Sequence, residues 1–107
     1  MPAPISIIIP TLNSETDLYE TLGSLFEGIE NSLIRELIIS DGGSTDKTKS
    51  IAYGVGAILI EGPRSRGLQI SKGVDKSRGD WVLILHADTS LSLDLSLIHI
   101  SEPTRPY

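Results

Sequence analysis

The chain has 107 residues, of which 39% are hydrophobic and 21% are charged, a composition typical of one small globular domain. Its formal net charge of -5 and its scattered basic residues argue against a nucleic-acid-binding surface, because such surfaces depend on clustered lysine and arginine. The lack of cysteine excludes a disulfide framework and a thiolate metal site. No apolar run could span a membrane. A cytoplasmic location is the default expectation.

The first apolar run, residues 5–9, predicts a buried strand, and the polar cluster Pro10-Thr11-Leu12-Asn13 follows it directly. Threonine and asparagine offer hydrogen bonds to a ligand at this position, although a strand end followed by a helix cap is the simpler explanation of the cluster alone. An amphipathic helix should follow, with Asn13 or Ser14 as N-cap and Glu15 and Asp17 in its first turn. Its inward face would hold Leu18, Leu22, Leu25, Phe26 and Ile29.

The second apolar run, residues 37–39, leads into Asp41-Gly42-Gly43-Ser44-Thr45-Asp46. Two glycines let a backbone approach a ligand closely, and an aspartate at the carboxyl end of a strand can accept hydrogen bonds from a base or a ribose. The alternative is a tight turn with helix-capping hydroxyls. A helix is predicted to begin after this turn and to end near Gly54 and Gly56, with Ser44 or Thr45 as cap and with Ile51, Ala52 and Val55 facing inward.

The third run, residues 57–60, is followed by a loop that carries Arg64 and Arg66. Guanidinium groups match the geometry of phosphate, and a helix N-terminus next to them adds partial positive charge. Two solvated surface arginines are the alternative. The helix is predicted over residues 66–77, with Leu68, Ile70 and Val74 as packing positions and Gly79 as a left-handed stop.

The fourth run, residues 81–85, ends in His86-Ala87-Asp88-Thr89. Residues two apart in an extended segment point the same way, so His86 and Asp88 could reach one ligand. A hard cation, Mg²⁺ or Mn²⁺, would take Asp88 together with phosphate oxygens of a substrate, and His86 is a candidate second ligand. A polar strand end with an internal hydrogen bond is the alternative.

The order of elements predicts an α/β, Rossmann-like sheet of about four mostly parallel strands with crossover helices. Ligands of such sheets bind beyond the carboxyl ends of the strands, where the four polar clusters lie. Residues 95–105 read like one frame of a transposase sequencing adapter, so we expect residues 1–94 to be the native part and residues 95–107 a non-native tail. An ordinary short amphipathic tail is the alternative.

In order and spacing, these clusters resemble those of the family 2 glycosyltransferases, which have the GT-A fold. The similarity covers residues 4–92, carried by residues 5–13, 41–46, 64–69 and 83–89. The narrowest likeness is to the bacterial subgroup associated with radical-SAM/selenodomain proteins or arsenosugar biosynthesis, whose fourth strand also ends in a sequence similar to Leu-His-Ala-Asp-Thr. The chain would then be the N-terminal, nucleotide-sugar-binding half of such an enzyme.

That resemblance implies a role for each matching residue. Pro10, Thr11 and Asn13 would line the nucleotide pocket, and Asp41 would hydrogen-bond the base. Ser44 and Asp46 would cap the second helix. Arg64, Arg66 and Gln69 would approach the ribose or the diphosphate. Asp88 would be the metal-binding aspartate of the family's Asp-x-Asp motif, in which His86 replaces the first aspartate.

The implied reaction moves a sugar from a UDP- or GDP-sugar to an acceptor hydroxyl, with inversion at the anomeric carbon. A divalent cation would neutralise the leaving diphosphate, and a general base would deprotonate an acceptor that the sequence does not identify. In the family that base lies beyond the Asp-x-Asp strand, so we assign no catalytic residue here and expect the chain itself to be inactive. Two other functions stay open, a nucleotidyltransferase and a nucleotide- or partner-binding module without catalysis.

Overall fold

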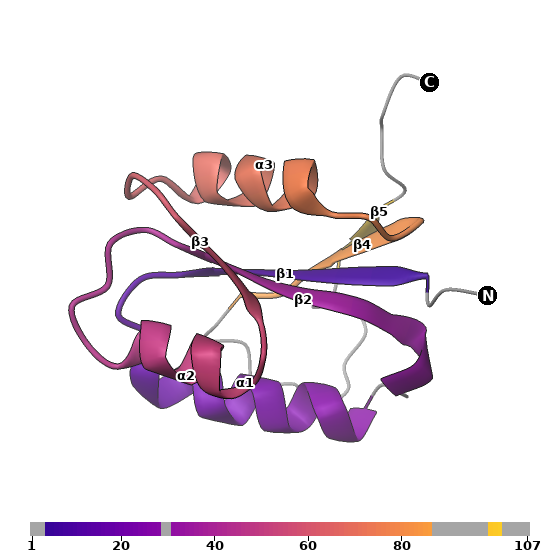
Figure 1. The fold of residues 1–107 in the computed structure, drawn as a ribbon, viewed down its shortest axis with the longest axis horizontal. Coiled ribbons are helices and arrows are strands. Elements are labelled where there is room, and N and C mark those ends of the chain that lie inside the picture. The colour runs from indigo at the N-terminus through magenta and orange to yellow at the C-terminus, as the bar shows by residue number, and fades with distance from the viewer. Residues whose placement is uncertain (1–3, 29–30, 87–98, 102–107) are drawn as a thin grey trace.

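The computed structural model describes residues 4–28, 31–86 and 99–101 of the chain. Strands and helices alternate along it in the predicted order (Figure 1). The elements are β1 (Ile5–Thr11), α1 (Glu15–Gly28), a short 3₁₀ helix (Asn31–Leu33), β2 (Ile34–Asp41), α2 (Thr48–Gly54), β3 (Ile58–Glu61), α3 (Arg66–Lys76), β4 (Trp81–Ile84) and β5 (His99–Ser101). In this described part no helix is long and apolar enough to cross a membrane.

The strands form one sheet in the order β3-β2-β1-β4-β5. The pairs β1–β2, β1–β4 and β2–β3 are parallel, which confirms the predicted α/β arrangement, and β5 adds to β4 in the antiparallel direction. The chain runs outward from β1 to β3 and then returns to place β4 on the opposite side of β1. Strand order therefore reverses beside β1, and such a switch point is where open α/β sheets bind ligands.

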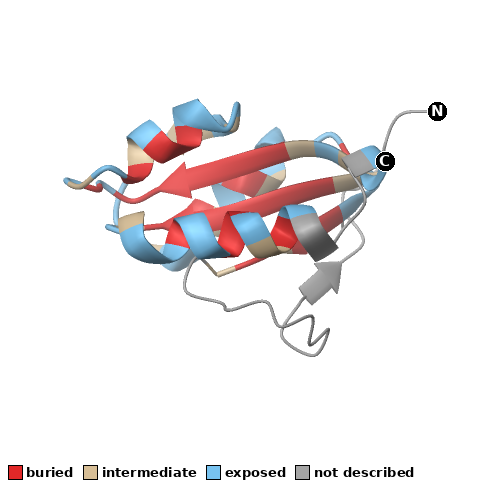
Figure 2. Ribbon diagram, turned by 90° about the horizontal axis from the view of Figure 1, so that it is seen from below, coloured by how far each residue is buried: buried red, intermediate tan, exposed pale blue. Residues whose placement is uncertain are grey.

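Helices cover both faces of the sheet, with α1 and α2 on one face and α3 on the other (Figure 1). The central strand is buried along most of its length (Figure 2), and its side chains alternate between the two faces. Ile7 and Ile9 join the larger core, which also contains Leu18, Leu22 and Leu25 of α1 and Ile51 and Ala52 of α2. On the other face Ile8 packs with Ile38 and Val82.

The α3 side of the sheet is packed differently from the prediction. Leu68, expected to face inward, is 50% exposed, whereas Gln69 and Gly73 are buried. A Cβ on Gly73 would lie only 2.6 Å from Cγ2 of Ile8, so the glycine lets the helix approach β1 closely. The predicted packing position Val74 does pack, partly buried, against the core on this face, whereas the Leu68 prediction was wrong because the first turns of the helix approach the sheet through a polar residue and a glycine.

Further sequence predictions need correction at the ends of elements. Helix α2 begins at Thr48 rather than soon after Gly43, and its N-cap residue, Lys47, makes no side-chain cap. Val55 and Phe26, expected to face inward, are 40% and 42% exposed, and Ile29 lies outside the described residues. Helix α1 begins at Glu15, so the predicted N-cap at Ser14 is in place, but its hydroxyl bonds Leu12 instead of the first turn.

Gly79 is not the predicted left-handed helix stop, because the positive-φ glycines of the described chain are Gly43 and Gly56. It is required instead by a tight packing site at the amino end of the sheet. A Cβ there would lie 2.7 Å from the carbonyl oxygen of Pro4, and the Gly79 N–H donates to Ser6 Oγ over 2.8 Å. This end is opposite to the carboxyl ends at which a ligand would bind.

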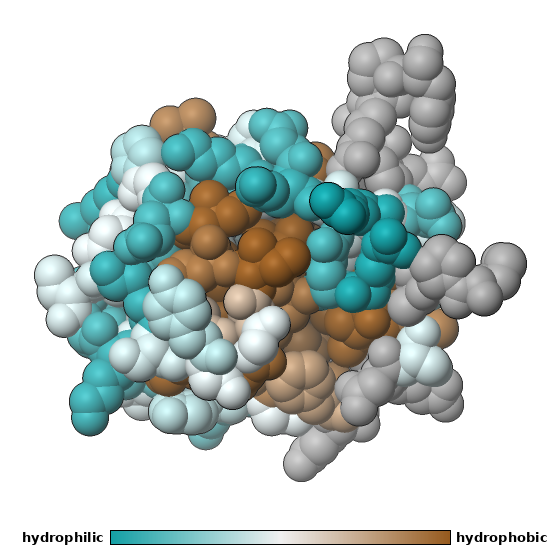
Figure 3. Space-filling view, in the orientation of Figure 1, coloured by the Kyte–Doolittle hydropathy of each residue, from teal (hydrophilic) through white to brown (hydrophobic). Residues whose placement is uncertain are grey.

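The strand β3 forms one edge of the sheet. Ile58 at its start is 42% exposed. In Figure 3 apolar side chains gather over this edge, between α3 and α2.

Candidate nucleotide-binding site

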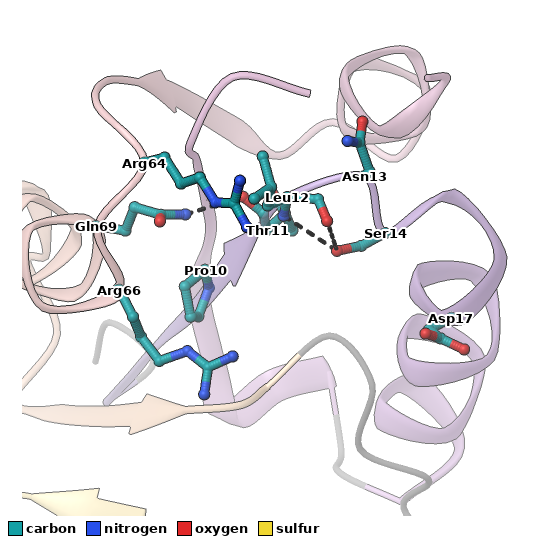
Figure 4. Close-up of a pocket in the computed structure, with 9 residues that line it drawn as sticks. All are labelled: Pro10, Thr11, Leu12, Asn13, Ser14, Asp17, Arg64, Arg66 and Gln69. Carbon is teal, nitrogen blue, oxygen red and sulfur yellow. Dashed lines mark hydrogen bonds between the residues drawn. The ribbon is translucent and has the colours of Figure 1, made fainter. Parts of the chain in front are cut away.

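A pocket of about 380 Å³ lies at the carboxyl end of β1, between the first turns of α1 and α3 (Figure 4). It therefore lies at the switch point of the sheet. Its lining residues are Pro10, Thr11, Leu12, Asn13, Ser14, Asp17, Arg64, Arg66 and Gln69. Six of the residues singled out in the sequence are among them, and the structure thus brings together two motifs more than 50 residues apart.

Asp41 is not among the residues that line this pocket, and its side chain is fully buried. Its Oδ1 accepts hydrogen bonds from the hydroxyls of Thr11 (2.7 Å) and Ser44 (2.5 Å). Its Oδ2 accepts from the backbone N–H groups of Gly43 (3.0 Å) and Ser44 (2.8 Å). The base contact predicted for Asp41 stays a prediction, and it would require one of these four bonds to open.

These hydrogen bonds stabilise the negatively charged form of Asp41. Burial alone raises the pKa of this carboxyl, but the hydrogen bonds from Ser44, Thr11 and Gly43 outweigh that effect, and the pKa lies below its usual value. The carboxylate consequently joins the end of β1 to the loop that follows β2. We interpret Asp41 as the residue that fixes the floor of the pocket.

Asn13 has a left-handed backbone, with φ of 48°, which is uncommon for a residue other than glycine. Its N–H donates to Ser44 Oγ (2.8 Å), and its Oδ1 accepts from the N–H of Thr45 (2.8 Å). The loop after β2 therefore holds this conformation in place. Backbone conformations of this kind are enriched where ligands bind.

Asp46 caps two helices at once. Its Oδ1 accepts from the N–H of Thr48 (2.9 Å) at the start of α2, and its Oδ2 accepts from the N–H of Glu15 (3.1 Å) at the start of α1. The predicted capping role of Asp46 is thus confirmed and extended to α1. Ser44 does not cap α2, because its hydroxyl is engaged with Asp41 and Asn13.

The opposite wall comes from the start of α3. Ser65 is the N-cap of this helix, with Oγ accepting from the N–H of Leu68 (3.4 Å), and Arg64 and Arg66 lie on either side of it. Both arginines are exposed, and neither takes part in the one salt bridge of the described residues, which joins Lys49 to Glu61. In Figure 4 both arginine side chains extend from the α3 side of the pocket toward the end of β1.

The pocket also contains residues that the sequence reasoning did not select, namely Leu12, Ser14 and Asp17. Leu12 lies within the selected motif and Ser14 follows it directly. Their closeness to that motif in the sequence could have identified both as pocket residues. Asp17 was noted only as an acidic residue of a helix first turn. It lines the pocket from the first turn of α1.

The predicted metal ligands lie just after β4. His86 is half-buried, and its Nδ1 is buried without a hydrogen-bond partner in the described part of the chain. An unpaired buried imidazole nitrogen is chemically suited to a metal or a ligand group. Asp88 lies outside the described residues, and those that are described contain no group of three metal-ligating side chains. His86 thus offers one nitrogen atom as a metal ligand, which fits a cation held largely by substrate oxygens.

Comparison with known proteins identifies the class of protein that has this fold and pocket. Residues 6–98 match the model of the glycosyl transferase family 2, and the chain belongs to that family. It is 39% identical over 99 residues to a PGL/p-HBAD biosynthesis glycosyltransferase of Mycobacterium tuberculosis, covering 85% of this chain and 38% of the relative. It is also 30% identical over 96 residues to the glucosyl-3-phosphoglycerate synthase of Mycolicibacterium paratuberculosis, covering 78% of this chain and 28% of the relative.

Solved structures of similar proteins support the same family and fold. The Mycobacterium tuberculosis glucosyl-3-phosphoglycerate synthase in complex with Mn²⁺, UDP and glucosyl-3-phosphoglycerate superposes with a TM-score of 0.68 at 26% identity, covering 79% of this chain and 33% of that one. The same enzyme has been solved with UDP-glucose and phosphoglyceric acid. The predicted enzyme family and fold are therefore confirmed, and the chain spans less than two fifths of the length of these relatives.

Proposed function

We propose that this chain supplies the donor-binding half of an inverting glycosyltransferase, which moves a sugar from a nucleoside diphosphate sugar to an acceptor hydroxyl. The observation that carries the proposal is the pocket at the end of β1, where a hydrogen-bonding wall from Pro10 to Asn13 faces Arg64 and Arg66. The hydrogen-bonding groups suit a nucleoside, and the arginines and the N-terminus of α3 suit a diphosphate.

Among nucleotides we propose UDP, because the similar glucosyl-3-phosphoglycerate synthase has been crystallised with UDP and UDP-glucose. The predicted alternative, GDP, has no such support. We further propose a divalent cation, Mn²⁺ or Mg²⁺, bound by Asp88 and His86 together with the diphosphate. When bound, it would stabilise the negative charge of the leaving group.

Other parts of the function stay predictions. No residue of the chain is assigned as the base that must deprotonate the acceptor, so we propose that the chain binds the donor without completing the transfer. The acceptor is unassigned. The narrower likeness to the radical-SAM- or arsenosugar-associated subgroup and the cytoplasmic location are likewise predictions.

Calorimetry with UDP, in the presence and absence of Mn²⁺, tests the proposal. The unsubstituted chain should bind UDP, and replacing both arginines (Arg64→Ala with Arg66→Ala) should weaken binding by about tenfold or more, because two charged contacts to phosphate are lost. Arg35→Ala is the matched control, since Arg35 is exposed at the start of β2, away from the pocket. Folded protein that releases no heat with UDP, or an equal loss in the control, would contradict the proposal.

A further inference from the structure

We infer that Gln69 is a positioning residue, whose side-chain amide ties the first turn of α3 to the ends of β1 and β2 and thereby sets the place of Arg66. The inference rests on the proposed function, because it concerns the same pocket. It assigns Gln69 a different task from the direct contact with ribose or diphosphate that the sequence suggested.

The hydrogen bonds of Gln69 support this role. Its Nε2 donates to the carbonyl oxygen of Thr11 and to that of Ser40, each over 2.9 Å. Thr11 is the last residue of β1, and Ser40 is the penultimate residue of β2, the parallel strand beside it. A carboxamide has two N–H hydrogens, and the two carbonyls use both. The nitrogen of Gln69 therefore has no hydrogen left to offer a phosphate or a ribose.

The surroundings of the amide are closely fitted. Gln69 is only 6% exposed although it lines the pocket. A Cβ on Gly42 would lie 2.8 Å from Oε1 of Gln69, so the glycine after β2 leaves the space that the amide occupies. The Gly42 N–H donates to the same Thr11 carbonyl over 2.9 Å. Three segments distant in sequence thus meet at this amide.

The position of Gln69 on α3 connects this junction to the arginines. Arg66 and Gln69 are three residues apart, so they share one side of the first helical turn, and both line the pocket. The apolar contacts of α3 with the sheet, at Gly73 and Val74, lie one turn further along the helix. Loss of the amide should therefore release the N-terminal turn while the rest of the helix stays packed.

The nucleoside wall includes Thr11, whose carbonyl bonds Gln69, but it also has supports that do not involve Gln69. Asn13 is fixed by Ser44 and Thr45, and the Thr11 hydroxyl is fixed by Asp41. Removal of the Gln69 amide should hence impair the diphosphate end of the pocket more than the nucleoside end. Comparing UDP with uridine separates positioning of the arginines from a general loss of structure.

The experiment measures binding of UDP by calorimetry and of uridine by chemical-shift titration, in the unsubstituted chain and in Gln69→Leu. Leucine keeps a similar volume and removes both donors. We expect Kd for UDP to rise about tenfold, as for the loss of two hydrogen bonds, and Kd for uridine to change less than about twofold. Ser71→Ala is the control, because Ser71 is exposed on the same helix.

A second variant, Gln69→Glu, gives a pH-dependent readout and serves if the leucine variant does not fold. An ionised carboxylate can donate no hydrogen bond to the two carbonyls, whereas the protonated acid can donate one. The ratio of the variant's Kd for UDP to that of the unsubstituted chain, measured at each pH, should therefore fall between pH 8 and pH 5.

The outcomes are distinguishable. Equal weakening of UDP and uridine, unchanged UDP binding in Gln69→Leu, or a ratio in Gln69→Glu that does not depend on pH would overturn the positioning role. Failure of the folded, unsubstituted chain to bind UDP would overturn the proposed function, and this inference with it.

Discussion

Removal of the Asp41 carboxylate should destabilise the fold as well as the pocket. Asp41→Ala takes away the acceptor of four hydrogen bonds at the junction of β1 with the loop after β2. Asp41→Asn keeps the shape and one acceptor oxygen. Comparing the two variants separates the loss of hydrogen bonding from the loss of charge.

The magnitude follows from which donors are left without a partner. The Thr11 hydroxyl, the Ser44 hydroxyl and the Ser44 N–H belong to residues that are buried, whereas Gly43 is exposed and its N–H can reach water. Three buried donors at about 1 kcal/mol each give a loss of about 3 kcal/mol for Asp41→Ala. Asp41→Asn should cost about 1 kcal/mol, since the amide oxygen can still accept from the backbone and the hydroxyls can rotate to accept from the amide nitrogen.

Urea unfolding at pH 7 gives these free energies of unfolding, with Asp80→Ala as the control for removing one negative charge at an exposed site. The pKa of Asp41 is lowered in the folded chain, so the stability that its charge provides is complete above the unfolded value of about 3.9. It is lost as the pH falls through the lower folded value. The difference between the unsubstituted chain and Asp41→Asn should therefore shrink in acid.

Two results would refute this reasoning. One is a loss in Asp41→Ala no larger than that in Asp80→Ala, which would mean that the buried bonds do not hold the loop. The other is a difference between the unsubstituted chain and Asp41→Asn that grows as the solution becomes more acidic, which would mean that the folded pKa is raised.

Glycine substitutions test the packing of the helices. Gly73→Ala should lower stability by about 1–3 kcal/mol, because the added methyl meets Ile8 at 2.6 Å, and thermal unfolding will measure it. Gly67→Ala in the same helix meets no atom within 4 Å and should instead stabilise by about 0.5–1 kcal/mol, so an equal effect of both would contradict the close approach of α3. Gly56→Ala, at φ of 76° with open space around it, should cost about 1 kcal/mol through backbone strain alone; an unchanged melting temperature would argue against that conformation.

The sequence predicted the strands well because their signal is local. Runs rich in β-branched apolar residues, such as residues 5–9, are typical of any strand covered on both faces, wherever its neighbours lie. The spacing of Leu18, Leu22 and Leu25 likewise located α1, since a long amphipathic helix carries its period in its own residues. In α3 the same reasoning found Val74 but failed for Leu68, because the buried residues of this helix, Gln69 and Gly73, contribute nothing to an apolar pattern.

The sequence predicted most residues of the candidate site but not how they are arranged in space. The sequence by itself determined that polar clusters follow the strands, which sufficed to select Pro10, Thr11, Asn13, Arg64, Arg66 and Gln69. Only the tertiary structure decided that β4 returns to the far side of β1 and that Asp41 is buried in hydrogen bonds instead of lining the pocket. Strand order and the partner of a buried carboxylate depend on contacts between residues far apart in the chain, and no local pattern encodes those contacts.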